Sequence, residues 1–344
     1  MIDRRNFIKT SIITGIGVSA GTYAMGSSLQ SSVAAGKKVG IIGLDTSHSI
    51  AFTKTLNSAD AGNSYNGYKV VAAYPKGSLD IKSSVDRIEG YVKQVKDMGV
   101  EITGSIDELL QKVDVVLLET NDGRRHLEQV LPVLKAGKRV FIDKPIAASL
   151  EDAMIIFRAS EHYGIPLFSA SSLRYIKGAD EIKNGSVGKV MGAETFSPAS
   201  LEETHPDLFW YGIHGVETLF TLMGTGCKQV TRAFTPGMDV VVGVWEDDRI
   251  GTFRGLRSGK TGYGGTVFGE KGITTLGSYN GYNPLLKEIV DYFDTGKVPI
   301  DPKETIEIFA FMQAADESKK AGGKPVSVDK VMEKARKQSS KFKF

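Results

Sequence analysis

Short runs of aliphatic and β-branched residues alternate with longer amphipathic stretches between residues 38 and 163. The runs predict strands that are covered on both faces, because such strands need no polar alternation. The five expected strands are VGIIG, KVVAAY, VEIT, VDVVLLE and KRVFID. Helical spacing of apolar residues predicts helices over residues 49–57, 81–98, 105–112, 124–136 and 150–163. This alternation is typical of a parallel sheet built from strand-helix-strand units.

The pattern changes after about residue 170, where longer strands with alternating apolar and polar residues follow. They include KVMGAETFS, CKQVTRAFT, DVVVGVWED, RIGTFRGLR and TGYGGTVFGEKG. Helices are expected over residues 211–223, 283–296 and 302–321, the last returning across the domains. We therefore predict an α/β protein. A Rossmann-type doubly wound parallel sheet at residues 36–160 precedes an α/β domain with an open-faced, mostly antiparallel sheet at residues 161–344.

The first 35 residues differ from the rest of the chain. The positively charged segment MIDRRNFIKT precedes the apolar run SIITGIGVSAG, and small residues cluster around Ala34 and Ala35. This order of segments is typical of an export signal. Arg4-Arg5 followed by Asn-Phe-Ile-Lys resembles a twin-arginine signal, which a receptor recognises. We expect residues 1–35 to direct the protein to the periplasm through the twin-arginine export machinery. Whether the segment is cleaved stays open.

The composition excludes several classes of partner. The chain has 344 residues, a formal net charge of +3 and a single cysteine, Cys227. No basic stripe is present to neutralise phosphates, so we expect no nucleic-acid partner. A single cysteine excludes an intramolecular disulfide. Glu202, Glu203, His205 and His214 could be arranged as metal ligands, but their spacing matches no metal motif, so we expect no metal.

The segment KVGIIGLDTSHS at residues 38–49 leaves the binding of a dinucleotide open. Gly43 starts a dinucleotide-binding turn, but Asp45 and His48 replace the second and third glycines of the fingerprint. Asp45 is expected to place a negative charge near a pyrophosphate, at a cost of roughly 1 to 4 kcal/mol. Thr46, Ser47 and the helix N-terminus still offer hydroxyl and N–H groups to an anion.

A longer motif lies in residues 114–153, DVVLLETNDGRRHLEQVLPVLKAGKRVFIDKPIAASLEDA. The segment resembles the Gfo/Idh/MocA family of glucose-fructose oxidoreductases and inositol dehydrogenases, whose pattern is a strand, T-P-N, a His, A-G-K, a strand and E-K-P. The matching residues are Thr120, Asn121, His126, Ala136, Gly137, Lys138, Lys144 and Pro145, with Asp143 where the family usually has Glu. The resemblance continues to GEKG at residues 269–272. It implies NAD or NADP as cofactor, a sugar or polyol substrate and a homo-oligomer.

The resemblance also implies the site. Lys144 matches the lysine beside nicotinamide and substrate, and His214 matches the histidine of a D-x-x-x-H motif in which Trp210 replaces Asp. Either another group orients His214, or this histidine does different work. Glu217, one helical turn later, could share its face. The candidate catalytic residues are Lys144, His214, His205 and Tyr211. The candidate cofactor-binding residues are Gly43, Asp45, Thr46, Ser47, His48, Lys76, Thr120, Asn121, His126, Lys144 and Pro145. The candidate substrate-binding residues are Lys144, Arg174, Trp210, Tyr211 and His214.

Two functions follow from these observations. The first is an exported oxidoreductase that acts on a sugar or polyol with tightly bound NAD(P); Lys76 suits a phosphate and favours NADP. The alternative is a non-redox sugar-active lyase or hydrolase, or a sugar-binding protein, that has lost the cofactor. Aromatic residues near His205 and His214 suit a sugar ring in either case.

Overall fold

The computed structural model describes residues 37–344. The predicted export signal at residues 1–35 lies outside the described residues. None of the helices in the described part has the length and apolar character needed to cross a membrane.

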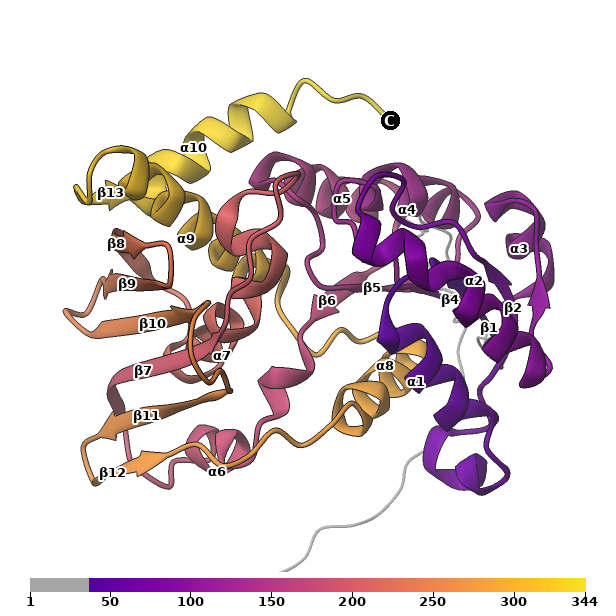
Figure 1. The fold of residues 1–344 in the computed structure, drawn as a ribbon, viewed down its shortest axis with the longest axis horizontal. Coiled ribbons are helices and arrows are strands. Elements are labelled where there is room, and N and C mark those ends of the chain that lie inside the picture. The colour runs from indigo at the N-terminus through magenta and orange to yellow at the C-terminus, as the bar shows by residue number, and fades with distance from the viewer. Residues whose placement is uncertain (1–36) are drawn as a thin grey trace, which may run out of the picture. The chain divides into compact units, whose positions relative to one another are not determined.

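The first sheet has six parallel strands in the order β3-β2-β1-β4-β5-β6, which is the Rossmann order (Figure 1). The strands are β1 (Lys38–Ile42), β2 (Lys69–Tyr74), β3 (Glu101–Ile102), β4 (Val115–Leu118), β5 (Arg139–Asp143) and β6 (Leu167–Ala170). The predicted doubly wound parallel sheet is therefore confirmed. The predicted boundary at residue 160 is too early, because β6 pairs in parallel with β5. Its four residues, LFSA, are too few to show a period.

Helices cover both faces of this sheet. The helices from the same part of the chain are α1 (Ser47–Asn57), α2 (Lys82–Asp97), α3 (Ile106–Lys112), α4 (His126–Lys135) and α5 (Leu150–Tyr163). One face packs against α3, α4 and α5. The other face packs against α1, α2 and α8 (Asn283–Thr295), so a helix from the C-terminal part of the chain completes the first layer.

The second sheet has seven strands in the order β12-β11-β7-β10-β9-β8-β13. They are β7 (Val190–Pro198), β8 (Cys227–Thr235), β9 (Met238–Trp245), β10 (Ile250–Leu256), β11 (Gly264–Gly269), β12 (Gly272–Thr275) and β13 (Val326–Ser327). Only β7 and β10 pair in parallel among these strands of the described region, which confirms a mostly antiparallel sheet.

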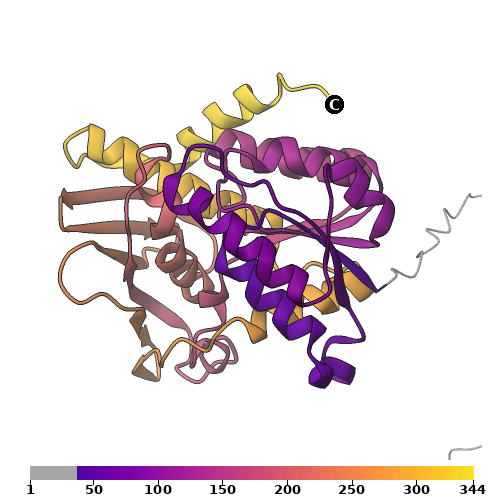
Figure 2. The same ribbon diagram turned by 45° about the vertical axis from the view of Figure 1, so that its right-hand side comes forward.

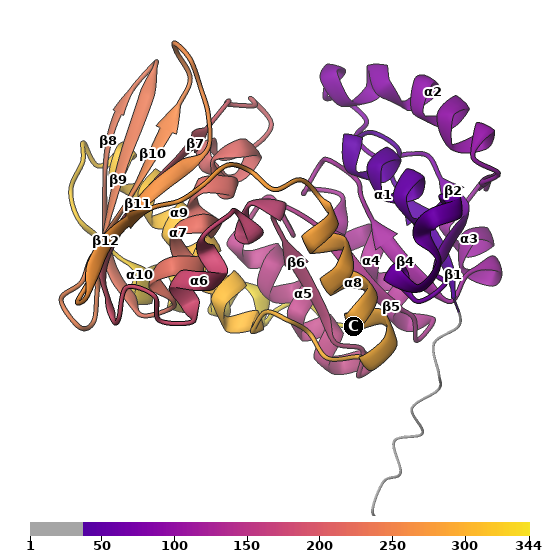
Figure 3. The ribbon, with the colours of Figure 1, turned by 90° about the horizontal axis from the view of Figure 1, so that it is seen from below.

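The remaining helices lie on one side of the second sheet (Figure 3). They are α6 (Ala179–Lys183), α7 (Ile213–Met223), α9 (Pro302–Lys320) and α10 (Val328–Ser339). Figure 2 shows α10 beside α5, and both α9 and α10 contact α5, so the C-terminal helices return to the first domain as predicted. We call residues 37–170 the Rossmann domain and residues 171–344 the C-terminal domain.

Candidate active site

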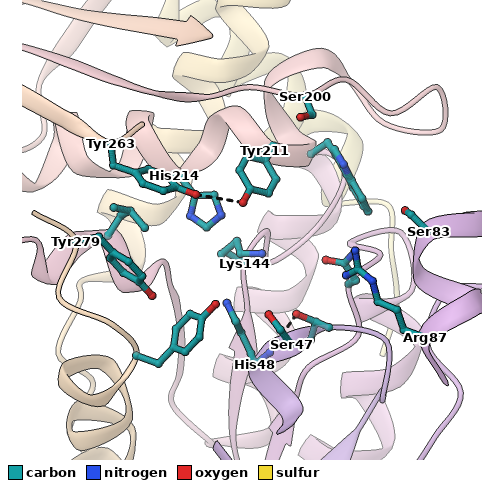
Figure 4. Close-up of a pocket in the computed structure, with 15 residues that line it drawn as sticks. Ser47, His48, Ser83, Arg87, Lys144, Ser200, Tyr211, His214, Tyr263 and Tyr279 are labelled. Carbon is teal, nitrogen blue, oxygen red and sulfur yellow. Dashed lines mark hydrogen bonds between the residues drawn. The ribbon is translucent and has the colours of Figure 1, made fainter. Parts of the chain in front are cut away.

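A cavity of about 350 Å³ lies where the carboxyl ends of the parallel strands face the C-terminal domain (Figure 4). The Rossmann domain contributes Thr46, Ser47, His48, Ser83, Arg87, Asn121 and Lys144 to its walls. The C-terminal domain contributes Leu173, Ser200, Trp210, Tyr211, His214, Tyr263, Tyr279 and Tyr282. This size is within the range of small-molecule sites. The cavity therefore joins the two domains at the edge where ligands bind in such sheets.

The N-terminus of α1 opens on this cavity. Thr46 caps the helix, since its Oγ1 accepts the N–H of His48 at 3.4 Å. Ser47 is exposed beside it. Gly43 precedes this turn with a φ of 90°, and an added Cβ would lie 2.5 Å from the backbone N of Thr120, so only glycine fits there. A helix N-terminus of this kind attracts an anion.

Asp45 does not carry its charge to the cavity, contrary to the expectation from the sequence. Its side chain is fully buried, and its two oxygens accept the N–H groups of Ser78 at 2.7 Å and of Asn121 at 3.0 Å. The carboxylate thus joins the ends of β1, β2 and β4. Burial raises the pKa of Asp45, although these two hydrogen bonds oppose the rise. The expectation that Asp45 repels a pyrophosphate is therefore corrected. Its carboxylate faces the backbone N–H groups of Ser78 and Asn121.

Lys144 directly follows β5 and lies in the middle of the cavity between two groups of side chains (Figure 4). Its Nζ is 3.8 Å from Oδ2 of Asp143, which is also 3.0 Å from Nδ1 of His48. Burial alone would raise the pKa of Asp143, but the facing charges of His48 and Lys144 hold it well below its usual value. Asp143 therefore positions both His48 and Lys144 at the cavity floor.

His214 faces Lys144 from the second residue of α7. Its Nδ1 is 2.6 Å from Oγ of Ser171, so a serine takes the orienting place of the missing carboxylate. Glu217 does not contact this ring as proposed from the sequence, because it accepts hydrogen bonds from the Ser171 N–H and from Arg174 Nε, both at 2.9 Å. Burial, and then the charge of Lys144, hold the pKa of His214 well below its usual value. The imidazole is therefore neutral near pH 7 and can accept a proton.

Trp210 and Tyr211 reach the cavity from a π-helical turn, residues Leu208–Gly212, which leads directly into α7. The hydroxyl of Tyr211 is 3.2 Å from that of Tyr263, and the hydroxyl of Tyr279 is 2.9 Å from Oγ of Ser172. The wall opposite the strand ends thus combines aromatic faces with hydroxyl groups. Such a wall suits a ligand that has an apolar face and several hydroxyls.

Two residues that the sequence indicated for substrate or catalysis lie away from the cavity. Arg174 is 4% exposed and pairs with Glu217 and Glu304 through contacts of 2.9 and 2.6 Å, so its guanidinium is committed to a buried ion pair. The His205 side chain is fully buried, with Nε2 3.3 Å from Oδ1 of Asp122. Both assignments are corrected: these residues hold the structure together, and His205 links the C-terminal domain to the loop after β4.

Several residues predicted to bind the cofactor also lie outside the cavity lining. His126 is fully buried and bonds to the carbonyl oxygens of Thr120 at 2.7 Å and Ile146 at 3.2 Å, so it joins the loops after β4 and β5. Lys76 is exposed outside the cavity. Gly43, Asp45, Thr120 and Pro145 support the cavity from behind without lining it. The other candidates line the cavity: Thr46, Ser47, His48, Asn121, Lys144, Trp210, Tyr211 and His214.

Seven cavity residues were missed from the sequence: Ser83, Arg87, Leu173, Ser200, Tyr263, Tyr279 and Tyr282. Ser83 and Arg87 are one turn apart on α2, and their spacing was the available signal. Arg87 adds a positive charge near the N-terminus of α1 (Figure 4). Tyr263 lies at the start of the predicted strand TGYGGTVFGEKG, and Tyr279 and Tyr282 lie in the glycine-containing segment GSYNGYN.

Comparison with known proteins identifies the Rossmann domain. Residues 37–170 match the GFO_IDH_MocA model, described as an oxidoreductase family with an NAD-binding Rossmann fold. This match covers the Rossmann domain of the chain. Inositol 2-dehydrogenase 3 of Saccharopolyspora erythraea is 32% identical over 134 residues, which are 36% of this chain and 38% of that protein. The 2,7-anhydro-N-acetylneuraminate hydratase of Escherichia coli is 30% identical over 144 residues, 37% of this chain and 38% of that protein.

The likeness in sequence thus covers less than half the length of these relatives, whereas the likeness in fold covers both domains. The structure of scyllo-inositol dehydrogenase from Lactobacillus casei with bound NAD(H) and scyllo-inositol superposes with a TM-score of 0.67 at 16% identity. The superposition covers 85% of this chain and 99% of that one. The likeness in fold to this structure therefore extends through the C-terminal domain.

The residues of this chain fit a dinucleotide, although two glycines of the fingerprint are replaced. The close approach of Gly43 to Thr120 preserves the tight turn after β1. The N-terminus of α1, Ser47 and Arg87 would hold the phosphates, and Lys144 would lie beside the nicotinamide. Arg87 and the helix N-terminus thus supply the anion contacts that a glycine-rich loop usually makes.

Proposed function

We propose that this protein is an NAD(P)-dependent oxidoreductase that acts on a sugar or polyol. The observation that carries the proposal is that Lys144 of the Rossmann domain and His214 of the C-terminal domain line one cavity, within a wall of tyrosine hydroxyls. The bound nicotinamide supplies the hydride acceptor. A relative named as an inositol dehydrogenase supports a cyclic polyol as the substrate class.

The residues of the cavity have separate roles toward a substrate hydroxyl. Lys144 donates a hydrogen bond to the reacting oxygen and stabilises negative charge there. When Nδ1–H of His214 donates to Ser171, Nε2 is free to accept the hydroxyl proton. Tyr211, Tyr263 and Tyr279 bind the other hydroxyls of the ring.

A single-turnover experiment tests this proposal. Purified protein is mixed with a panel of polyols and sugars, with and without added NAD⁺ or NADP⁺, and the absorbance of reduced nicotinamide is followed. We expect one substrate class to reduce the cofactor, and Lys144→Met to abolish the signal. Conversion of a substrate by protein that holds no dinucleotide, with none added, would contradict the oxidoreductase assignment.

A second candidate is a lyase or hydrolase acting on a sugar. A relative named as a hydratase, together with the replacement of two fingerprint glycines by Asp45 and His48, favours it. The same experiment separates the candidates, because a non-redox enzyme forms product when no dinucleotide is bound or added.

We also propose export to the periplasm. The support is Arg4-Arg5 and the apolar run that follows them. That compartment offers no pool of free dinucleotide, so an exported enzyme must bring its cofactor bound and regenerate it within each cycle. Replacing both arginines by lysine should leave the precursor in the cytoplasm. Normal export of that variant would exclude the twin-arginine route.

A further inference from the structure

A cluster of three buried ionisable side chains lies beneath the cavity floor. His48 comes from the first turn of α1, Glu119 directly follows β4, and Asp143 ends β5. One atom of each, a ring nitrogen or a carboxylate oxygen, lies within 4.8 Å of the others. Glu119 and Asp143 are fully buried and His48 is 5% exposed. The oxidoreductase chemistry proposed above gives Glu119 no role.

Both carboxyl oxygens of Glu119 lack a hydrogen-bond partner in residues 37–344. Buried polar atoms are nearly always partnered, because their desolvation otherwise costs free energy. Lys144 Nζ lies 3.8 Å and His48 Nδ1 lies 3.0 Å from Oδ2 of Asp143, so both basic groups face Asp143 and neither bonds to Glu119. The Glu119 carboxyl group is therefore left without a donor or a cation.

A proton satisfies the cluster only in part. If Glu119 were protonated, its O–H could donate to Oδ2 of Asp143, but the other oxygen of Glu119 would still lack a donor. A cation that both oxygens of Glu119 bind satisfies these atoms together. The ring nitrogen of His48 is the third ligand atom of the cluster, after the carboxylate oxygens of Glu119 and Asp143.

We propose that His48, Glu119 and Asp143 bind a divalent transition-metal ion, Zn²⁺ or Mn²⁺. Nδ1 of His48 is 3.0 Å from the Asp143 carboxylate. Ligands at about 2.0–2.2 Å from a zinc ion lie roughly 3.0–3.5 Å from one another. A mixed imidazole and carboxylate set suits these ions, whereas Ca²⁺ and Mg²⁺ select oxygen ligands. The spacing of His48 and Asp143 is therefore already that of two ligands to one ion.

The metal content of the full-length protein tests the proposal. The chain is stripped with a chelator, loaded with Zn²⁺ or Mn²⁺, desalted and measured by mass spectrometry of the metal. We expect one ion per chain and a higher Tm in the loaded protein. Glu119→Gln and His48→Gln should lose both effects. His162→Gln removes an exposed histidine of α5 and should keep both, so it controls for binding at surface imidazoles.

A second measurement does not depend on the variants. The parent protein loaded with Co²⁺ should show the visible absorption of a cobalt ion bound by nitrogen and oxygen ligands. A parent protein that retains no ion, or a Glu119→Gln variant that retains as much as the parent, would overturn the proposal. Neither measurement uses substrate or nicotinamide, so failure here leaves the oxidoreductase assignment untouched.

Discussion

The Asp45 carboxylate fills the space that a side chain at Gly77 would need, since an added Cβ on Gly77 would lie 2.3 Å from Oδ2 of Asp45. The two residues end neighbouring strands, and the pair explains the missing glycine of the fingerprint. Residue 77 must be glycine to leave room for Asp45, and the Asp45 carboxylate accepts the N–H groups of Ser78 and Asn121.

Asp45→Ala should therefore destabilise the fold. It leaves two N–H groups without their charged acceptor, so we expect the free energy of unfolding to fall by about 2–4 kcal/mol in urea titrations. Asp97→Ala, at an exposed position of α2, should change it by less than about 0.5 kcal/mol. An Asp45→Gly variant that keeps the parent's stability and binds NAD(P) about tenfold tighter would restore the idea of charge repulsion.

Removal of the facing cavity groups should abolish turnover without unfolding the protein. Lys144→Met and His214→Gln should each lower kcat by roughly 10²- to 10⁴-fold, because each group acts on the reacting hydroxyl. Circular dichroism should show unchanged secondary structure. His162→Gln, on an exposed part of α5, serves as the control. Normal turnover in the His214 variant would remove it from the mechanism.

The depressed pKa of His214 gives stability a defined pH dependence. Burial, Lys144 and His48 lower this pKa, and Asp143 opposes them only in part. The unfolded chain takes up a proton near pH 6.5 that the folded chain refuses, so the free energy of unfolding should fall as the pH falls below about 6.5. One imidazole contributes at most about 1.4 kcal/mol per pH unit.

Urea unfolding of parent and His214→Gln at a series of pH values measures this contribution. The variant should show a shallower decline than the parent between about pH 7.5 and 5.5. The pH dependence that remains in the variant includes a contribution from His126, because burial also lowers the pKa of this residue. Equal slopes in parent and variant would mean that His214 titrates normally.

The open face of the second sheet should form a contact between copies of this chain. Phe196, Ile250, Phe268 and Ile273 share this face by register and are 39–70% exposed. Exposed apolar groups on one sheet face favour association. Light scattering should show a dimer or larger assembly, and Phe268→Glu should dissociate it. Val85→Glu, on α2, is the matched control; a monomeric parent would contradict the prediction.

The sequence predicts the strands and helices whose apolar residues recur with a clear period. Strands such as β4 and helices such as α5 follow from apolar runs and from capping residues, among them Ser149, whose side chain accepts the N–H of Asp152. β6 was missed because four residues carry no period. That α8 packs on the first sheet follows from tertiary packing alone, since its apolar face could have covered either sheet.

The sequence predicts which residues lie at the strand ends around the site. It does not predict the direction in which their side chains point. Lys144 and His214 line the cavity as the family motif implied. Asp45 points inward because Ser78 and Asn121 offer it N–H groups, and these donors are 33 and 76 residues away in the chain. His205 likewise faces Asp122 of the other domain. No local pattern encodes such distant partners.

The most direct test of the proposed function is the amount of dinucleotide that the protein holds at equilibrium. Full-length protein is equilibrated with NAD⁺ or NADP⁺ and passed over an ultrafilter, and the protein fraction is denatured and measured by mass spectrometry. This procedure counts both tightly held and exchanging cofactor. We predict that the protein fraction holds more dinucleotide than the filtrate, by one molecule per chain. The Arg87→Ala variant should hold a smaller excess. No excess of either dinucleotide in the protein fraction would contradict the oxidoreductase assignment.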